Sequence, residues 1–313
     1  MKLFIINFFT FIFATVVIFS AINILQSYNN NQPVQNKLKY SVINNPSKNF
    51  DGIIMGSSHV ALSIKPKLLK NTNISFYNFA FNGSNPEYNY KWYDNLLKDK
   101  QNQVKYCVIG IDWFMFDSYA LQRKFEQDSE YFKISLFLKL LFSINNIDKK
   151  QLILERFPFI KYRKEIISSL EGQSGDPFFP IQTYDNGYIA FQPIFDSTTY
   201  IANAKFNIDK IQVYYLKKLI SNLITNKIKI IFVMTPEYNI SPTLYKRMKS
   251  LEIINLIAEK YNIPILNFNT TLRSNINDNI NYFSDWGHMN NEGAKVFSIF
   301  LSKEINKIKK TKY

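Results

Sequence analysis

The chain has 313 residues, a net charge of +14 and one cysteine, Cys107. A single cysteine excludes an internal disulfide, and its place in an apolar run indicates a core residue. No cluster of Cys and His has the spacing of metal ligands, so neither a metal nor a cofactor is implied. Only five of the 38 basic residues are arginine and no nucleic-acid motif is present, so the charge favours an anionic membrane face or polymer over nucleic acid.

The N-terminal part of the chain is strongly apolar. Leu3 to Leu25 carry no charged side chain, and a hydrocarbon core needs about 20 such residues. A cleaved signal peptide has an apolar region of about 7–15 residues and is the alternative, although Phe19-Ser20-Ala21 matches a cleavage site poorly. We expect an uncleaved transmembrane anchor over residues 1–26. Its flanking basic residues are nearly balanced, which leaves the orientation open.

A short polar linker over 27–38 is expected to lead into one domain over 39–313. Five short apolar runs, separated by helical segments, are typical of a parallel sheet covered on both faces. The runs are 52–55, 74–79, 106–111, 228–234 and 263–268, and helices are predicted over 86–97, 209–225, a segment after 241–242, and 291–308. We therefore predict a flavodoxin-like, three-layer α/β fold with a five-stranded parallel sheet and a ligand site at the carboxyl ends of its strands. The loop 235–237 is a candidate wall of that site or a plain turn.

An insertion is predicted over about 118–207, between the third and fourth strands. It should contain a helix around 131–142, a loop over 172–180 and a hairpin at 184–188, where Asn-Gly is a strong turn signal. Insertions of this kind often carry specificity. The many Tyr and Phe residues here could stack on sugar rings, but packing onto the core is the simpler interpretation.

The only two histidines stand in short segments that suggest hydrolytic chemistry. A serine nucleophile needs a base within hydrogen-bond reach, and that base needs an acidic partner. His288 follows Asp285 by three residues before the last predicted helix, so the carboxylate can reach the inner ring nitrogen. Ser58 follows the first predicted strand, where Gly56 permits a sharp turn. We predict a Ser58/His288/Asp285 triad, although each segment alone is more often a plain turn or a helix cap.

Taken together, residues 56–58, 78–84 and 285–288 resemble the conserved blocks of the SGNH (GDSL-like) hydrolases. The resemblance covers most of residues 50–310. It looks closest to the membrane-anchored bacterial branch that includes the D-alanyl-lipoteichoic acid transfer protein and the acetyl-transferring proteins of surface-polysaccharide assembly.

This resemblance implies roles for individual residues. Ser58 would be the nucleophile, and its amide would join the Gly83 amide in an oxyanion hole, where each donor is worth ~10²–10³ in turnover. The family commonly places a further donor, an asparagine, where this chain has Asp112. An ionised Asp112 can only accept, and its charge would oppose an oxyanion unless it binds another group or is protonated. Asn82 or Asn85 could replace the missing donor.

Three residues are candidates for the pocket: His59, Asp112 and Trp113. The neighbouring His59 is expected to be a hydrogen-bonded packing residue or a substrate contact. The resemblance implies an extracytoplasmic serine esterase or O-acyltransferase of the bacterial cell envelope that acts on surface or lipid-linked glycans. Its partners would be an acylated glycan or acyl donor and a membrane-bound acyltransferase. A non-catalytic binding or assembly subunit with the same fold is the alternative, motivated by Asp112, and a lipase is a third.

Overall fold

The computed structural model describes residues 7–8, 10–11, 13–15, 17, 34–45, 48–98, 104–117, 121–143, 147–157, 184–190, 207–238 and 244–312. The chain divides into two units. Met1–Lys37 and Phe125–Pro180 form the first, and Leu38–Lys124 and Ile181–Tyr313 form the second. The second unit holds the central sheet and every residue of the candidate site.

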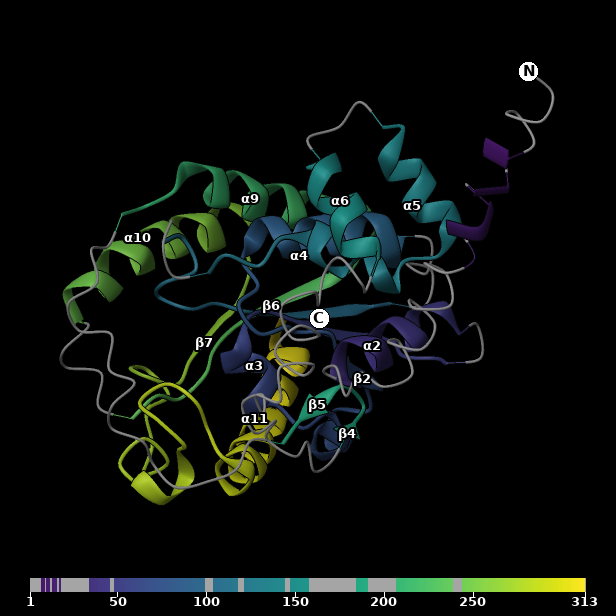
Figure 1. Ribbon diagram of the computed structural model, residues 1–313. Helices are drawn as coiled ribbons and strands as arrows, with labels where there is room; N and C mark the ends of the chain where they lie inside the picture. The colour runs from purple at the N-terminus through teal and green to yellow at the C-terminus, as the bar shows by residue number, and fades with distance from the viewer. Residues whose placement is uncertain are drawn as a thin grey trace. The chain divides into compact units, whose positions relative to one another are not determined.

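Five parallel strands form that sheet, in the order β2-β1-β3-β6-β7 (Figure 1). The strands are β1 (Gly52–Met55), β2 (Phe76–Asn78), β3 (Tyr106–Gly110), β6 (Lys229–Met234) and β7 (Ile265–Asn267). The predicted five-stranded parallel α/β arrangement is confirmed. From β1 the chain passes to β2 on one side and then crosses to β3 on the other side of β1, so the carboxyl ends of β1 and β3 flank the crevice in which open α/β sheets bind ligands.

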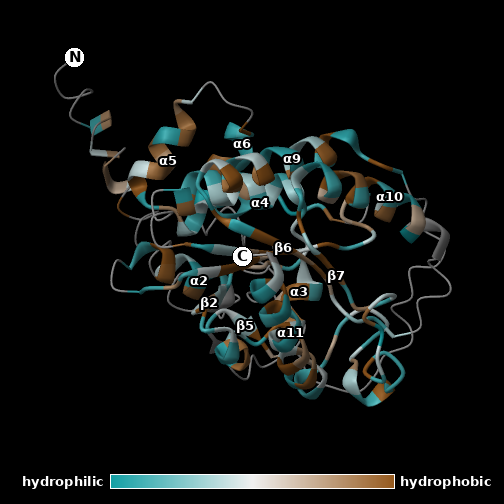
Figure 2. Ribbon diagram, turned by 180° about the vertical axis from the view of Figure 1, so that it is seen from behind, coloured by the Kyte–Doolittle hydropathy of each residue, from teal (hydrophilic) through white to brown (hydrophobic). Residues whose placement is uncertain are grey.

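Helices cover both faces of the sheet, as Figure 1 shows. On one side lie α4 (Pro86–Trp92), α9 (Lys210–Thr225) and α10 (Leu244–Tyr261), and on the other lie α3 (Ser58–Ser63) and α11 (Asn291–Lys312). Ile54, Val108 and Ile231 in the central strands are fully buried. Burial on both faces explains why the strands read as continuous apolar runs, and in Figure 2 the central strands are largely brown whereas the helices carry both colours.

Capping residues mark where the helices begin. Asn85 accepts a hydrogen bond from the amide of Tyr88 at the start of α4, and Pro86 takes the first helical position. Asp209 caps α9 in the same way. The helix predicted over 86–97 is α-helical as far as Trp92, and Tyr93–Leu97 continue it as a π-helical turn.

A two-stranded hairpin of the second unit comprises β4 (Tyr184–Asp185) and β5 (Tyr188–Ile189). Its turn residues, Asn186 and Gly187, have φ values of 46° and 83°, the left-handed values that the predicted Asn-Gly turn requires. The carbonyl of Asn186 accepts a 2.8 Å hydrogen bond from the amide of Asn78. The hairpin is therefore joined to the end of β2.

The first unit contains a 3-10 helix over Phe125–Tyr131, α5 (Ile134–Leu141) and α6 (Lys149–Arg156). The helix predicted around 131–142 corresponds to α5, whereas α6 was not predicted. Residues 158–183, with the predicted loop at 172–180, lie outside the described residues, as do 191–206.

The N-terminal predictions fall largely on residues that the structure does not describe. Within the described ranges, no helix is long and apolar enough to cross a membrane. Most of the anchor predicted over 1–26 lies outside those ranges, as do residues 27–33 of the predicted linker. Helix α2 (Val34–Asn44) begins inside that predicted linker and buries Tyr40 and Ile43.

Candidate active site

Ser58 begins helix α3 three residues after the end of β1. The turn between them passes through Gly56, whose φ of 148° favours glycine. Gly110, at the end of the neighbouring β3, lets α3 pack closely against that strand, because a Cβ at Gly110 would lie 1.8 Å from a methyl of Val60 in α3. The start of α3, and with it the Ser58 hydroxyl, is thereby held against the carboxyl edge of the sheet.

His288 and Asp285 come from the loop that precedes α11. Oδ1 of Asp285 accepts hydrogen bonds from the amides of Gly287 and His288, each at 2.8 Å. Oδ2 lies 2.7 Å from Nδ1 of the His288 ring. The amide of Ser284 donates to the carbonyl of His288 at 2.8 Å and closes the turn. The loop thus fixes the carboxylate against the inner nitrogen of the imidazole.

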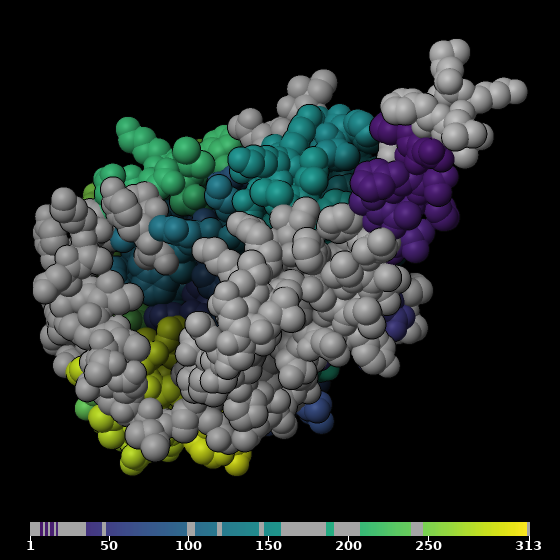
Figure 3. Space-filling model, in the orientation of Figure 1, coloured from purple at the N-terminus to yellow at the C-terminus, as the bar shows by residue number. Residues whose placement is uncertain are grey.

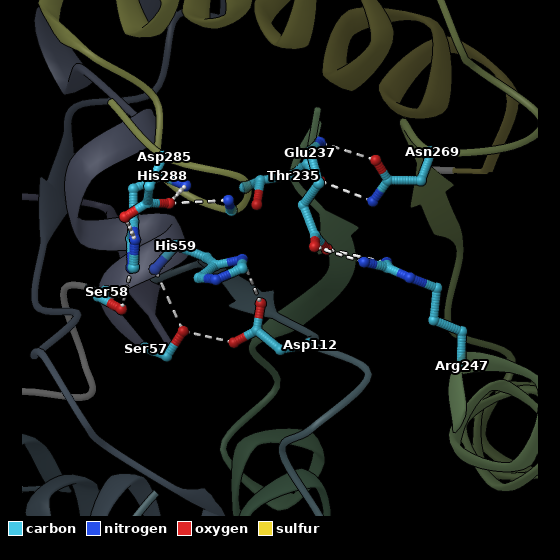
Figure 4. A network of polar contacts seen from close by, with 11 residues as sticks. Ser57, Ser58, His59, Asp112, Thr235, Glu237, Arg247, Asn269, Asp285 and His288 are labelled. Atoms are coloured by element: carbon cyan, nitrogen blue, oxygen red, sulfur yellow. Dashed lines mark hydrogen bonds and ion pairs between the residues drawn. The ribbon is translucent and has the colours of Figure 1, made fainter. Parts of the chain in front are cut away.

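The outer nitrogen of that imidazole faces the serine. Oγ of Ser58 lies 2.8 Å from Nε2 of His288, which is within hydrogen-bond range. Figure 4 shows the three side chains in a line from hydroxyl to imidazole to carboxylate. In Figure 3, dark-blue and yellow segments of the second unit, which come from early and late in its chain, are visible inside a recess of the surface.

The environment of Asp285 keeps it ionised. Burial by itself raises the pKa of this carboxyl, but the hydrogen bond and charge of the His288 ring and the amides of Gly287 and His288 outweigh that effect. The pKa of Asp285 is therefore lowered. An ionised Asp285 accepts from Nδ1–H, which leaves Nε2 free to accept the proton of Ser58.

Two backbone amides, those of Ser58 and Gly83, are the candidates for binding an oxyanion. Among the described residues, the amides of Ser58 and Gly83 donate to no acceptor. The turn that carries Gly83 is tied to Gly56, whose carbonyl accepts from the amide of Phe81 at 3.0 Å and from Oγ of Ser84 at 2.5 Å. Both predicted amide donors therefore lie on segments anchored beside the end of β1.

The two asparagines considered as further donors differ in their placement. Asn82 is exposed, and its carbonyl accepts a 3.5 Å hydrogen bond from Arg123. The side chain of Asn85 accepts from the amide of Tyr88 at 2.9 Å and donates to the carbonyl of Leu121 at 3.0 Å. Asn85 is thereby committed to the fold, which leaves Asn82 as the asparagine of this pair with an exposed side chain.

Asp112 is turned toward Ser57 and His59. Its carboxyl accepts a hydrogen bond from Oγ of Ser57, and its Oδ1 lies 3.5 Å from Nδ1 of His59. Burial raises the pKa of Asp112 and lowers the pKa of His59, although each group's charge acts on the other in the opposite sense. The raised pKa of Asp112 and the lowered pKa of His59 both favour the uncharged side chain, so the negative charge of Asp112 that would oppose an oxyanion is reduced.

Trp113 is 7% exposed and lies beside a buried ion pair. The guanidinium of Arg247 lies 5.5 Å from its ring and pairs with both carboxylate oxygens of Glu237, at 2.9 and 2.5 Å. Burial raises the pKa of Glu237, but Arg247 outweighs this, and the net pKa is lowered. Residues 235–237 were predicted only as a wall of the site or a plain turn. The pair of Glu237 with Arg247 was not predicted, because no spacing rule links a loop carboxylate to a helix ten residues on.

Among the residues that the structure describes, no group of three or more His, Cys, Asp or Glu side chains could hold a metal ion. Cys107 is fully buried in β3, and burial raises the pKa of its thiol, so it is a core residue as expected.

A parallel α/β sheet that presents a hydrogen-bonded serine, histidine and aspartate at its carboxyl edge has the arrangement of a serine hydrolase. No family model and no curated protein sequence matches the chain.

Several solved structures resemble it. They include the lipase/acylhydrolase from Enterococcus faecalis (10% identity, 82% of this chain and 95% of that chain covered, TM-score 0.41). A GDSL-like lipase from Bacteroides thetaiotaomicron is similar to it at 11% identity, with 87% and 98% covered and a TM-score of 0.42. A catalytic mutant of an acetylxylan esterase from Geobacillus stearothermophilus is similar at 9% identity, with 81% and 93% covered and a TM-score of 0.40.

Proposed function

We propose that this chain is a serine esterase or O-acyltransferase of the SGNH (GDSL-like) superfamily that works through an acyl-Ser58 intermediate. The observation that carries the proposal is the 2.8 Å separation between Oγ of Ser58 and Nε2 of His288, in line with the 2.7 Å contact between His288 and Asp285. A hydroxyl paired in this way can transfer its proton as it attacks.

In the first half of the reaction, Oγ of Ser58 attacks the carbonyl carbon of an ester while Nε2 of His288 takes the hydroxyl proton. The negative charge on the former carbonyl oxygen is stabilised by the free amides of Ser58 and Gly83. Asp285 stabilises the imidazolium that forms. When the tetrahedral intermediate collapses, the bond to the alkoxy group breaks, and His288 returns the proton to the leaving alcohol.

In the second half, a hydroxyl compound takes the place of the departed alcohol. His288 accepts its proton as its oxygen attacks the acyl-serine, and Ser58 leaves with a proton returned by the same imidazole. Water as the acceptor gives hydrolysis, and a sugar hydroxyl gives transfer. The residues that admit one or the other acceptor decide between esterase and acyltransferase.

The apolar segment from Leu3 to Leu25 and the resemblance of the site motifs support a particular setting. We propose a membrane-anchored enzyme of the bacterial cell envelope, with its α/β domain outside the cytoplasm. Its substrates would be acylated surface glycans or lipid-linked glycans. A membrane-bound acyltransferase would be the partner that supplies acyl groups.

The proposal is tested by acetate release from p-nitrophenyl acetate and from an acetylated polysaccharide, using the full chain. Transfer is followed in the same reactions by the mass of added sugar acceptors. We expect activity in the wild-type chain and its loss in Ser58→Ala, His288→Ala and Asp285→Ala. Wild-type rates in all three variants would contradict the proposal and favour a non-catalytic binding subunit.

A further inference from the structure

His59 is a buried imidazole that the reaction described above does not use. It follows Ser58 directly in α3 and is only 4% exposed. Its ring meets the ring of His288 edge to face, with centroids 4.8 Å apart and an interplanar angle of 69°. The ring of Phe114 packs against it in the same manner, at 4.9 Å and 72°. Figure 4 shows His59 between the catalytic line and Asp112.

One side of the His59 ring lies against the backbone of the catalytic loop. A Cβ built on Gly287 would be 2.8 Å from both Cε1 and Nε2 of His59. Real Cβ atoms essentially never approach other atoms so closely, so only glycine fits at position 287 while His59 keeps its place. The residue immediately before His288 is thus in direct contact with this second imidazole.

Asp112 lies on the other side of the His59 ring and limits the movement of that ring. Its Oδ1 lies 3.5 Å from Nδ1 of His59, and its Oδ2 accepts the hydrogen bond from Ser57, the residue that caps α3. Nδ1 of His59 is buried and makes no hydrogen bond within the described chain. An unsatisfied buried nitrogen is destabilising, and local sacrifices of stability of this kind are concentrated at functional sites.

We propose that His59 is a positioning residue for His288. Held between Asp112 and Gly287, its ring supports the loop 285–288 so that Nε2 of His288 stays in line with Oγ of Ser58. The proposal rests on the proposed function, because it assigns His59 a part in the same reaction. It also explains Asp112, which would hold His59 in place instead of donating to the oxyanion as the asparagine of the SGNH pattern does.

The charges around His59 are consistent with this role. Burial, the largest influence, lowers the pKa of His59. The charges of Asp112, Glu237 and Asp285 act to raise the pKa of His59, and that of His288 acts to lower it. A neutral His59 can pack against His288 without opposing the positive charge that His288 acquires when it takes the serine proton.

The first test measures how fast a fluorophosphonate labels Ser58 in the full chain, because this reaction reports on the nucleophile without a known substrate. We expect His59→Gln to lower the maximal labelling rate by ~10²-fold, the effect of misplacing a catalytic group by about 1 Å. The half-saturating reagent concentration should change by less than about threefold, because His59 does not contact the reagent. Equal maximal rates in the variant and the wild type would overturn the proposal.

The second test uses the fact that the chain has only two histidines. In the chain labelled with ¹⁵N-histidine, NMR should show a low-field proton from the hydrogen bond between Nδ1 of His288 and Asp285. We expect this signal to broaden or disappear in His59→Gln while circular dichroism stays unchanged. A purely packing role for His59 would leave the signal as it is, and that result would overturn the proposal.

Gly287→Ala tests the same contact from the opposite side, and the single variant leaves His59 in place. The added methyl should displace the loop and lower the labelling rate, and His59→Ala should lessen that loss in the double variant, because it removes the clash. Multiplicative losses in the double variant would contradict a direct contact. If the wild-type chain itself is not labelled at Ser58, the proposed function fails, whereas labelling of wild type and His59→Gln at equal rates defeats only the role of His59.

Discussion

Oγ of Ser58 lies 2.8 Å from Nε2 of His288, although 230 positions separate the two residues in the chain. Ser58 begins α3, just after β1, and His288 lies in the loop before α11, so the fold of the second unit brings these two segments together. The contact makes Ser58 the one described serine that is hydrogen-bonded to a histidine ring.

Replacing either partner should abolish the chemistry. We expect Ser58→Ala and His288→Ala each to lower kcat by ~10⁴–10⁶-fold, because each removes a group that the transition state requires. The double variant should be no worse than the poorer single variant by more than about tenfold, since the two act as a unit. Steady-state ester hydrolysis measures this, and independent, multiplicative losses would contradict a shared role.

Gly83→Ala should weaken the oxyanion site. Gly83 has a φ of 71°, which is costly for a residue with a Cβ by about 1–2 kcal/mol, although a Cβ there would be 3.8 Å from its nearest neighbour and would not clash. Relief of that strain should rotate the amide away from the oxyanion and lower kcat by ~10²-fold. KM and the melting temperature should change little by comparison. An unchanged kcat in a folded variant would remove Gly83 from the oxyanion hole.

Two substitutions of Asp112 separate shape from hydrogen bonding. Asp112→Asn keeps an oxygen for Ser57 and a polar atom facing His59, so we expect kcat within about tenfold of wild type. Asp112→Leu has a similar size but leaves both partners without a polar contact, and we expect a loss of ~10²-fold. Both rates are measured on the same ester substrate. A leucine variant as active as the asparagine variant would show that Asp112 does not hold His59.

The buried pair of Glu237 and Arg247 should dominate the acid stability of the loop after β6. Glu237→Gln leaves the guanidinium without its anion and should lower the free energy of unfolding by about 3–5 kcal/mol at pH 7. Glu252→Gln, at an exposed position of α10, is the control and should stay within about 0.5 kcal/mol of wild type.

The same ion pair makes the free energy of unfolding depend on pH. The pKa of Glu237 in the folded chain is below its ordinary value of 4.5. Its stabilising effect is therefore complete above about pH 4.5 and is lost as the pH falls through the lowered folded value. Urea unfolding of wild type and Glu237→Gln between pH 7 and pH 3 should show their difference shrinking only at the acid end. A difference that is constant over this range would show that Glu237 does not titrate with folding.

Much of the central fold could be predicted from local sequence, and the reasons are physical. Strands β1 and β6 were predicted nearly to the residue, because a strand buried on both faces is continuously apolar. The hairpin could be predicted because Asn-Gly is one of the few residue pairs that tolerate two left-handed φ values in succession, and Asn186 and Gly187 adopt such values. Helix α6 was missed although a signal exists: Asp148 caps it, with Gln151 three residues on, as in a capping box.

Tertiary contacts could not be predicted in the same way. The two short segments that contain the histidines predicted the pairing of Ser58 with His288, but nothing in the spacing of residues predicted the contact of His59 with Gly287. The bond from Ser57 to Asp112 joins residues 55 positions apart and depends on the neighbouring ends of β1 and β3. The departure at Asp112 from the SGNH pattern that the chain resembles was visible in the sequence, whereas the partners of Asp112 became visible only in the fold.

Activation of Ser58 can be measured by treating the full chain with a fluorophosphonate and determining the masses of the intact protein and its peptides. Ser58→Ala is treated in parallel. We expect one adduct, located on the peptide that contains Ser58 and absent from the variant. A folded wild-type chain that forms no adduct, or that forms it equally in Ser58→Ala, would contradict the account.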